Sequence, residues 1–199
     1  MIGIMSRPRP LPHDPIAEAH RQWVQHGWGS VADGMALVTS LVRAQQIVMA
    51  RVDDALKPSG LTFSRYELLQ LLSFSRTGAL PMAKASARLQ VHPTSVTNTV
   101  DRLEAAELVR RVPHPSDRRA TLIEITDAGR ESVAAATEAL NVEVFAEPGL
   151  PPEQGRQLLE LLAQFRHDAG DFAADGVKSP AFPSTSRPAG EASAGTGSG

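Results

Sequence analysis

The sequence predicts a mainly helical protein that carries one small β-hairpin. Most of the chain has apolar residues at helical spacing, and the spacing changes to that of strands only at residues 108–112 and 120–125. The two ends of the chain carry no such pattern. Because two short strands do not form a stable sheet alone, we expect the hairpin to pack against the neighbouring helices.

The composition excludes several classes of protein. The chain has 199 residues, 42% of them hydrophobic and 21% charged, which is typical of a globular protein. It has no cysteine, which excludes disulfides, Cys-ligated zinc and thiol-based redox sensing. No secretory signal or apolar run of about 18 residues is found, so we expect a cytoplasmic protein without membrane contact.

Two helices are expected in the N-terminal third. Residues 1–13 are rich in proline and are expected to be disordered. Asp14 reads as an N-cap and Pro15 as the first position of a helix that ends near residue 26 and carries Trp23. A longer helix at 31–56 has two adjacent apolar stripes, which indicates burial against its own domain and against a partner subunit.

The middle of the chain predicts a helix-turn-helix. A helix at 64–75 is followed by a short helix at 82–89, a tight turn and a further helix at 93–106. The hairpin follows at once. A helix-turn-helix with a hairpin directly behind it is the pattern of a winged helix-turn-helix, which typically binds DNA.

The C-terminal third predicts two more helices. Thr126 caps a helix that extends to about residue 143, and prolines at 148–152 separate it from a last helix at 153–173. Residues 174–199 consist mainly of small residues and proline, so this tail is expected to be disordered.

The helix at 93–106 is the candidate recognition helix. At about 100° per residue, Val96, Val100 and Leu103 fall on one side, which we expect to face the core. The opposite side is small and polar, so it fits the major groove, where Asn98 can pair with adenine. The residues of this helix expected to contact DNA are Thr94, Ser95, Thr97, Asn98 and Arg102.

The hairpin supplies the local positive charge that the net charge of −2 does not. Arg111, Arg118 and Arg119 are expected to contact DNA, the last two from the tip of the loop, where one can enter the minor groove. Asp117 is expected to shape the tip by pairing with an arginine.

Residues 31–170 resemble the MarR family of bacterial regulators. The resemblance rests on "VTNTVDRLEAAELVRR" at 96–111 and on "HPSDRRATLIEITDAGRE" at 114–131. Two residues depart from the family pattern. Glu107 replaces a glycine at the end of the recognition helix, where a left-handed residue other than glycine costs about 1 kcal/mol. His114 replaces an acidic residue at the start of the wing, which is the β-hairpin with the loop between its two strands.

The resemblance implies an architecture and a function. It implies a winged-helix domain at 14–173, with a DNA-binding lobe at 62–130 and dimerisation helices at 14–57 and 131–173. It implies a homodimer that reads a palindromic operator on double-stranded DNA and acts as a repressor responsive to a small aromatic or phenolic effector. The residues expected near the effector are Trp23, Arg43, Tyr66 and Glu67.

Other functions were weighed against DNA binding. A winged helix also serves as a protein–protein interaction module, but the exposed side of 94–105 lacks the aromatic or aliphatic anchors of such a surface. Trp23 and Glu67 leave a urate-responsive branch of the family open, although Thr99 stands where that branch has arginine. The histidines are scattered, which leaves metal sensing a minor hypothesis. No catalytic or cofactor motif is found, so we expect no enzyme and no cofactor.

Overall fold

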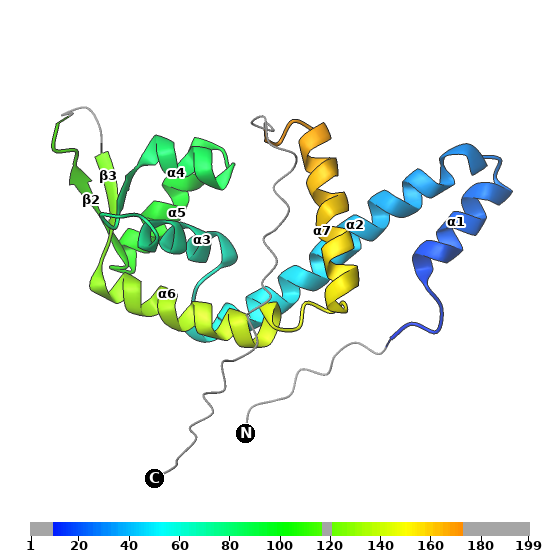
Figure 1. Cartoon of the computed structure of the whole chain (residues 1–199), viewed down its shortest axis with the longest axis horizontal. Helices are drawn as coiled ribbons and strands as arrows, with labels where there is room; N and C mark the ends of the chain where they lie inside the picture. The colour runs from blue at the N-terminus through cyan, green and yellow to red at the C-terminus, as the bar shows by residue number, and fades with distance from the viewer. Residues whose placement is uncertain (1–9, 117–120, 173–199) are drawn as a thin grey trace, which may run out of the picture. The chain divides into compact units, whose positions relative to one another are not determined.

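The computed structural model describes residues 10–116 and 121–172 (Figure 1). Most of the N-terminal segment and all of the C-terminal tail that the sequence predicts to be disordered lie outside the described residues. The chain forms two compact units, residues 1–147 and residues 148–199, which are described separately below.

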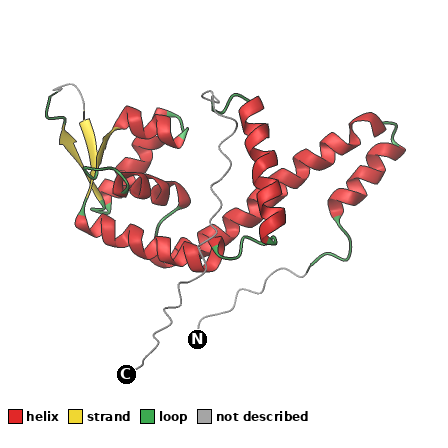
Figure 2. Cartoon of the chain, in the orientation of Figure 1, coloured by secondary structure: helices red, strands yellow, loops and turns green. Residues whose placement is uncertain are grey.

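The first unit is mostly helical, with three short strands (Figure 2). The predicted mainly helical winged-helix fold is therefore confirmed. Its elements in chain order are α1 (Pro15–Gln25), α2 (Gly29–Leu56), a 3₁₀ turn η1 (Lys57–Ser59), α3 (Phe63–Ser73), β1 (Ala79–Pro81), α4 (Met82–Leu89), α5 (Pro93–Ala105), β2 (Val109–Pro113), β3 (Thr121–Ile125), α6 (Asp127–Leu140) and a π-helical turn η2 (Asn141–Phe145).

The second unit contains one described helix, α7 (Pro152–Asp168), which begins with a proline at its first position. Considered as a separate unit, this helix leaves Leu161 and Phe165 exposed. None of the described helices, in either unit, is both long and apolar enough to span a bilayer.

The sheet has one strand more than the sequence predicted. Its order is β1-β3-β2, and both pairings are antiparallel. The missed strand β1 is only three residues long and ends in a proline, so it carries almost no period-two signal. It pairs Leu80 with Ile123, both of which are buried, and so anchors the hairpin to the helices.

The core of the first unit lies between the C-terminal end of α2, α3, α5, the sheet and α6. Its largest side chains are almost fully buried; they are Leu56, Leu68, Leu69, Leu72, Leu103, Ile123 and Leu140. Burial of such side chains from all these elements contributes most of the stability of this part of the chain.

Helix α1 packs against α2. Asp14 caps α1 by accepting from the Ile16 N–H at 2.9 Å, as predicted. Across the two helices, His20 Nε2 lies 2.8 Å from the carboxylate of Asp33. Between residues 31 and 48 of α2, six large apolar residues stay 45–61% exposed; they are Val31, Leu37, Val38, Val42, Ile47 and Val48.

Candidate nucleic-acid interface

Helix α5 presents the polar side that the sequence predicted. Its apolar residues Val96, Val100 and Leu103 are buried against the core. The helical period therefore turns the opposite side outward. The five residues of α5 that were predicted to contact DNA are all exposed; they are Thr94, Ser95, Thr97, Asn98 and Arg102.

Some polar groups on the exposed side of α5 already form hydrogen bonds within the helix, and others do not. The Thr97 hydroxyl donates to the Pro93 carbonyl at 3.1 Å, and the Thr99 hydroxyl donates to the Ser95 carbonyl at 2.9 Å. These hydroxyls keep their acceptor lone pairs. Asn98 and Arg102 form no hydrogen bond with any described residue, so both side chains have donors to offer to DNA.

The first turn of α5 begins at a histidine. His92 is the N-cap residue, and its ring Nδ1 accepts from the Thr94 backbone N–H at 3.3 Å. Pro93 occupies the first helical position, where its missing N–H costs no hydrogen bond. The Ser95 and Val96 N–H groups donate to the His92 carbonyl at 2.9 and 3.3 Å, and this end of the helix carries the positive end of its dipole, which favours a nearby phosphate.

Arg111 lies on β2 but its charge is directed toward α5. Its guanidinium forms ion pairs with Asp101 and with Glu104, and its backbone N–H donates to the Glu104 carboxylate at 2.9 Å. The hydrogen bond that Arg111 donates to Asp101 raises the pKa of Arg111, as does its pairing with Glu104. Arg111, which was predicted to contact DNA, therefore ties the wing to the recognition helix.

Arg110 is paired as well, across the hairpin. Its Nε lies 2.7 Å from the Glu124 carboxylate, and this hydrogen bond lowers the pKa of Glu124. Both arginines of β2 thus have acidic partners. The remaining basic residues of the wing, Arg118 and Arg119, lie outside the described residues together with Asp117.

The junction between α5, the wing and α6 is tightly constructed. Glu107 follows α5 with φ of +60°, so it takes the left-handed conformation of the glycine that the family pattern has there rather than forming a different cap. The Thr126 hydroxyl donates to the Glu107 carbonyl at 2.8 Å and accepts from the Gly129 N–H at 3.0 Å. A Cβ on Gly129 would lie 2.1 Å from the Leu108 carbonyl oxygen, which explains the glycine at this position.

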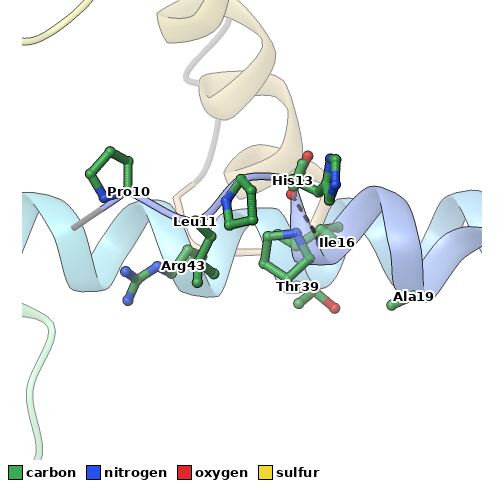
Figure 3. A pocket seen from close by; sticks show the side chains of 10 residues that line it. Pro10, Leu11, His13, Ile16, Ala19, Thr39 and Arg43 are labelled. Atoms are coloured by element: carbon green, nitrogen blue, oxygen red, sulfur yellow. Dashed lines mark hydrogen bonds between the residues drawn. The ribbon is translucent and has the colours of Figure 1, made fainter. Parts of the chain in front are cut away.

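The four residues predicted to lie near an effector do not share one site in the chain. Trp23 packs edge-on against Trp28, with ring centroids 5.4 Å apart. Tyr66 is buried, and Glu67 is exposed on the same helix. Arg43 lines a hollow of about 820 Å³ between residues 10–19 and α2, which contains none of the other three (Figure 3).

A second hollow, of about 470 Å³, lies between α3 and α6. Its wall includes the Gln70 amide and the Thr137 hydroxyl, which lie 3.1 Å apart, and the same hydroxyl lies 3.3 Å from the Tyr66 hydroxyl. Arg130 and Glu138 add charge, and Val133 and Val142 add apolar surface. This mixture suits a small amphipathic molecule.

Sequence reasoning missed the acidic partners of the wing. Glu104 was not singled out, although it receives both the backbone and the side chain of Arg111. No local spacing reveals such a pair, since a helix and a strand meet there only through the turn between them. Among the described residues, no group of three or more histidine, aspartate or glutamate side chains is placed to hold a metal ion.

Comparison with known proteins agrees with this geometry. The sequence model of the MarR family matches residues 61–121. Sco5413, a MarR family transcriptional regulator from Streptomyces coelicolor, is 49% identical, with a TM-score of 0.64 over 71% of this chain and 99% of that protein.

Two further solved structures are similar and contain ligands. Sco3205, a MarR family regulator from Streptomyces coelicolor in complex with DNA, is 25% identical, with a TM-score of 0.59 over 88% of this chain and 98% of that one. CouR from Rhodococcus jostii RHA1, bound to p-coumaroyl-CoA, is 26% identical, with a TM-score of 0.59 over 70% and 95%.

Proposed function

This chain belongs to the MarR family of transcriptional regulators, and we propose that it binds a palindromic operator as a homodimer and represses transcription until a small effector binds. The proposal further places it in the cytoplasm, where the bacterial chromosome is.

The exposed side of α5 carries the operator-binding part of the proposal. Its side chains are small or hydrogen-bonding, and no aromatic or large aliphatic residue interrupts them between Thr94 and Arg102. Such a surface lets the helix backbone approach the floor of the major groove, with Asn98 and Arg102 in reach of base edges or phosphates. A protein-docking helix would instead require apolar anchors.

The exposed apolar stripe of α2 supports a homodimer. Six large aliphatic residues of α2 stay about half exposed in the single chain, and a concentration of exposed apolar side chains on one helix typically marks an interface. A two-fold dimer through this stripe would present two copies of α5, and operators of such dimers repeat half-sites about one helical turn apart.

The effector is proposed to be a small aromatic or phenolic molecule. The hollow between α3 and α6 offers a guanidinium from Arg130, hydroxyl and amide groups around Thr137, and an apolar wall at Val133. CouR, a similar protein, is bound to p-coumaroyl-CoA in its solved structure. The hollow beside Arg43 is the second candidate site. An effector that prefers one dimer conformation shifts the spacing of the recognition helices.

Operator binding is the first test. Fluorescence anisotropy is measured with DNA from around the protein's own gene, at two salt concentrations and with excess nonspecific competitor DNA. It should show binding that resists the competitor, with two protein chains per operator. Asn98→Ala should weaken operator binding by more than tenfold, which corresponds to one lost base contact. Ser75→Ala, in the turn after α3, serves as the matched control. Binding that competitor DNA removes entirely would contradict the proposal.

Release by an effector is the second test. Phenolic acids and their thioesters are screened for dissociation of the operator complex. Thr137→Val should raise the concentration needed for release if the α3–α6 hollow is the site, and Arg43→Gln should do so if the other hollow is. A screen in which no compound releases the operator complex would count against ligand responsiveness.

A further inference from the structure

The chain contains the same short turn twice, once in each element of the DNA-reading surface. His-Pro-Thr at 92–94 begins α5, and His-Pro-Ser at 114–116 follows β2 at the start of the wing. In both turns the ring Nδ1 accepts from the backbone N–H two residues later, at 3.3 Å. The hydroxyls of Thr94 and Ser116 lie 3.1 and 3.3 Å from the same nitrogens.

In both turns Nδ1 serves as the acceptor, a role that is open only to a ring nitrogen that carries no proton. Protonation of Nδ1 would break the turn's hydrogen bond and give the ring a second donor and a positive charge. Imidazoles change charge between about pH 5 and 8.

The charged groups around the two turns do not oppose this change strongly. The element packed beside the His92 turn is α4, whose exposed Lys84 and Arg88 form no ion pair with any described residue. The acidic residues of α5, Asp101 and Glu104, are engaged by Arg111. Beside His114, the charges of the hairpin are Arg110 and Glu124, which pair with each other. Asp117, Arg118 and Arg119 follow in the chain, outside the described residues.

Two effects of protonation compete, and their sizes decide the sign. The hydrogen bonds lost are long, at 3.3 Å, and belong to turns at the protein surface, so they contribute little. The gain arises only on DNA, where a cation beside a phosphate releases a condensed counterion. His92 lies at the end of α5 that favours a phosphate, so the gain is the larger effect.

We propose that His92 and His114 are phosphate-contacting residues that take up protons when the protein binds its operator, so that acidification tightens the complex. The inference rests on the proposed function, because it needs DNA on the surface formed by α5 and the wing. A homodimer would carry four such rings.

The experiment measures operator affinity and its salt dependence at pH 6, 7 and 8, with an operator selected from a random DNA pool. Affinity at pH 6 should be about tenfold or more above that at pH 8. The slope of log affinity against log salt should steepen at pH 6 by about 1 for each ring that meets a phosphate. Calorimetry in two buffers of different ionisation enthalpy should show proton uptake on binding at pH 7.

The double variant H92N/H114N separates proton uptake from a merely structural role. Asparagine keeps an acceptor at both turns and is among the best N-cap residues, but it does not titrate. The variant should bind the operator with the same affinity at pH 6 and at pH 8, because the gain on acidification is lost. The control H20N/H26N removes two histidines of α1, including the partner of Asp33, and should keep the full gain.

The possible failures are distinguishable. No selected operator at any pH would overturn the proposed function and this inference together. Tight operator binding that is independent of pH, or a gain at pH 6 that persists in H92N/H114N, would overturn the inference alone. A gain lost in the α1 control would assign the titration to the contact between α1 and α2 and would overturn it as well.

Discussion

Two regions of the first unit bury their apolar residues to very different extents. We call the elements from α3 to β3 the lobe, and α1 with residues 29–48 of α2 the arm. In the lobe, Leu68, Leu103 and Ile123 are fully buried. In the arm, Val38 and Ile47 are at least half exposed, although they are as apolar as the core residues of the lobe.

The difference indicates that the lobe is complete in one chain and that the arm is not. Each lobe element buries an apolar side against another element of the same chain. Although α1 packs along α2, residues of both apolar stripes stay exposed, namely Leu37, Val38, Val42 and Val48, and we call these residues the open stripe. Exposed apolar surface of this extent normally marks an interface. Variants that act on one region and not on the other test this division.

The largest effect is expected from a charge in the open stripe of the arm. Val38→Asp should convert the dimer to a monomer, because an unpaired carboxylate would be buried at the interface. A monomer reaches only one half-site, so operator affinity should fall by at least about hundredfold. Light scattering after size exclusion gives the mass, and anisotropy gives the affinity.

The lobe should not respond to that substitution. Val38 makes no contact with the lobe core, so the circular dichroism spectrum of Val38→Asp should keep its native helical signal. Phe74→Asp places the same charge on a more exposed apolar residue at the end of α3, and it should leave the dimer intact. An unchanged mass for Val38→Asp would show that the open stripe is not the dimer interface.

The next largest effect is expected at the junction between α5, the wing and α6. Gly129→Ala would place a Cβ 2.1 Å from the Leu108 carbonyl oxygen, so the backbone of α6 or of the turn before β2 must shift. Such overpacking should lower the free energy of unfolding by about 2–3 kcal/mol, measured by urea denaturation.

The control for that variant is a glycine with free space around it. Gly155→Ala lies in α7, where an added Cβ meets nothing within 4 Å, and alanine favours the helix by about 0.5–1 kcal/mol. This variant should be as stable as the parent or more so. Equal effects of the two substitutions would contradict the tight junction.

These two regions also differ in how well the sequence predicts them. The helical periods of the lobe predicted which side of α5 is buried, because Val96, Val100 and Leu103 each recur within one turn of the next. The double stripe on α2 predicted burial that the single chain does not provide. The sequence pattern reports what is buried in the final assembly, whereas one chain shows only its own contacts.

The features that the sequence did not predict depend on contacts between different elements, and such contacts leave no periodic pattern in the sequence. The strand β1 is too short for a pattern, and it forms because Leu80 finds Ile123 in the sheet. The role of Arg111 depends on Glu104 and Asp101, which lie 7 and 10 positions earlier on another element. A basic cluster in the sequence predicts positive charge, but pairing decides how much of that charge faces DNA.

A smaller effect distinguishes the two kinds of arginine in the wing. Arg111→Ala should weaken operator binding by about tenfold through the loss of its ties to α5, while the slope of affinity against salt stays unchanged. Arg119→Ala should lower that slope by about 1, because it removes a proposed contact with DNA. Arg111→Lys keeps the charge but not the paired geometry and should recover only part of the affinity. A reduced slope for Arg111→Ala would mean that this residue meets a phosphate.

The smallest effect is a gain in stability at the end of α5. Glu107 has a φ of +60°, where any residue but glycine is strained, and its carbonyl is held there by the Thr126 hydroxyl. Glu107→Gly should therefore raise the free energy of unfolding by about 0.5–1 kcal/mol. Glu107→Ala removes the same side chain but keeps the strain, so it should leave the stability close to that of the parent. A loss of stability in both variants would show that the Glu107 side chain contributes more than its backbone strain costs, and the lobe would then owe part of its stability to a surface contact rather than to its core alone.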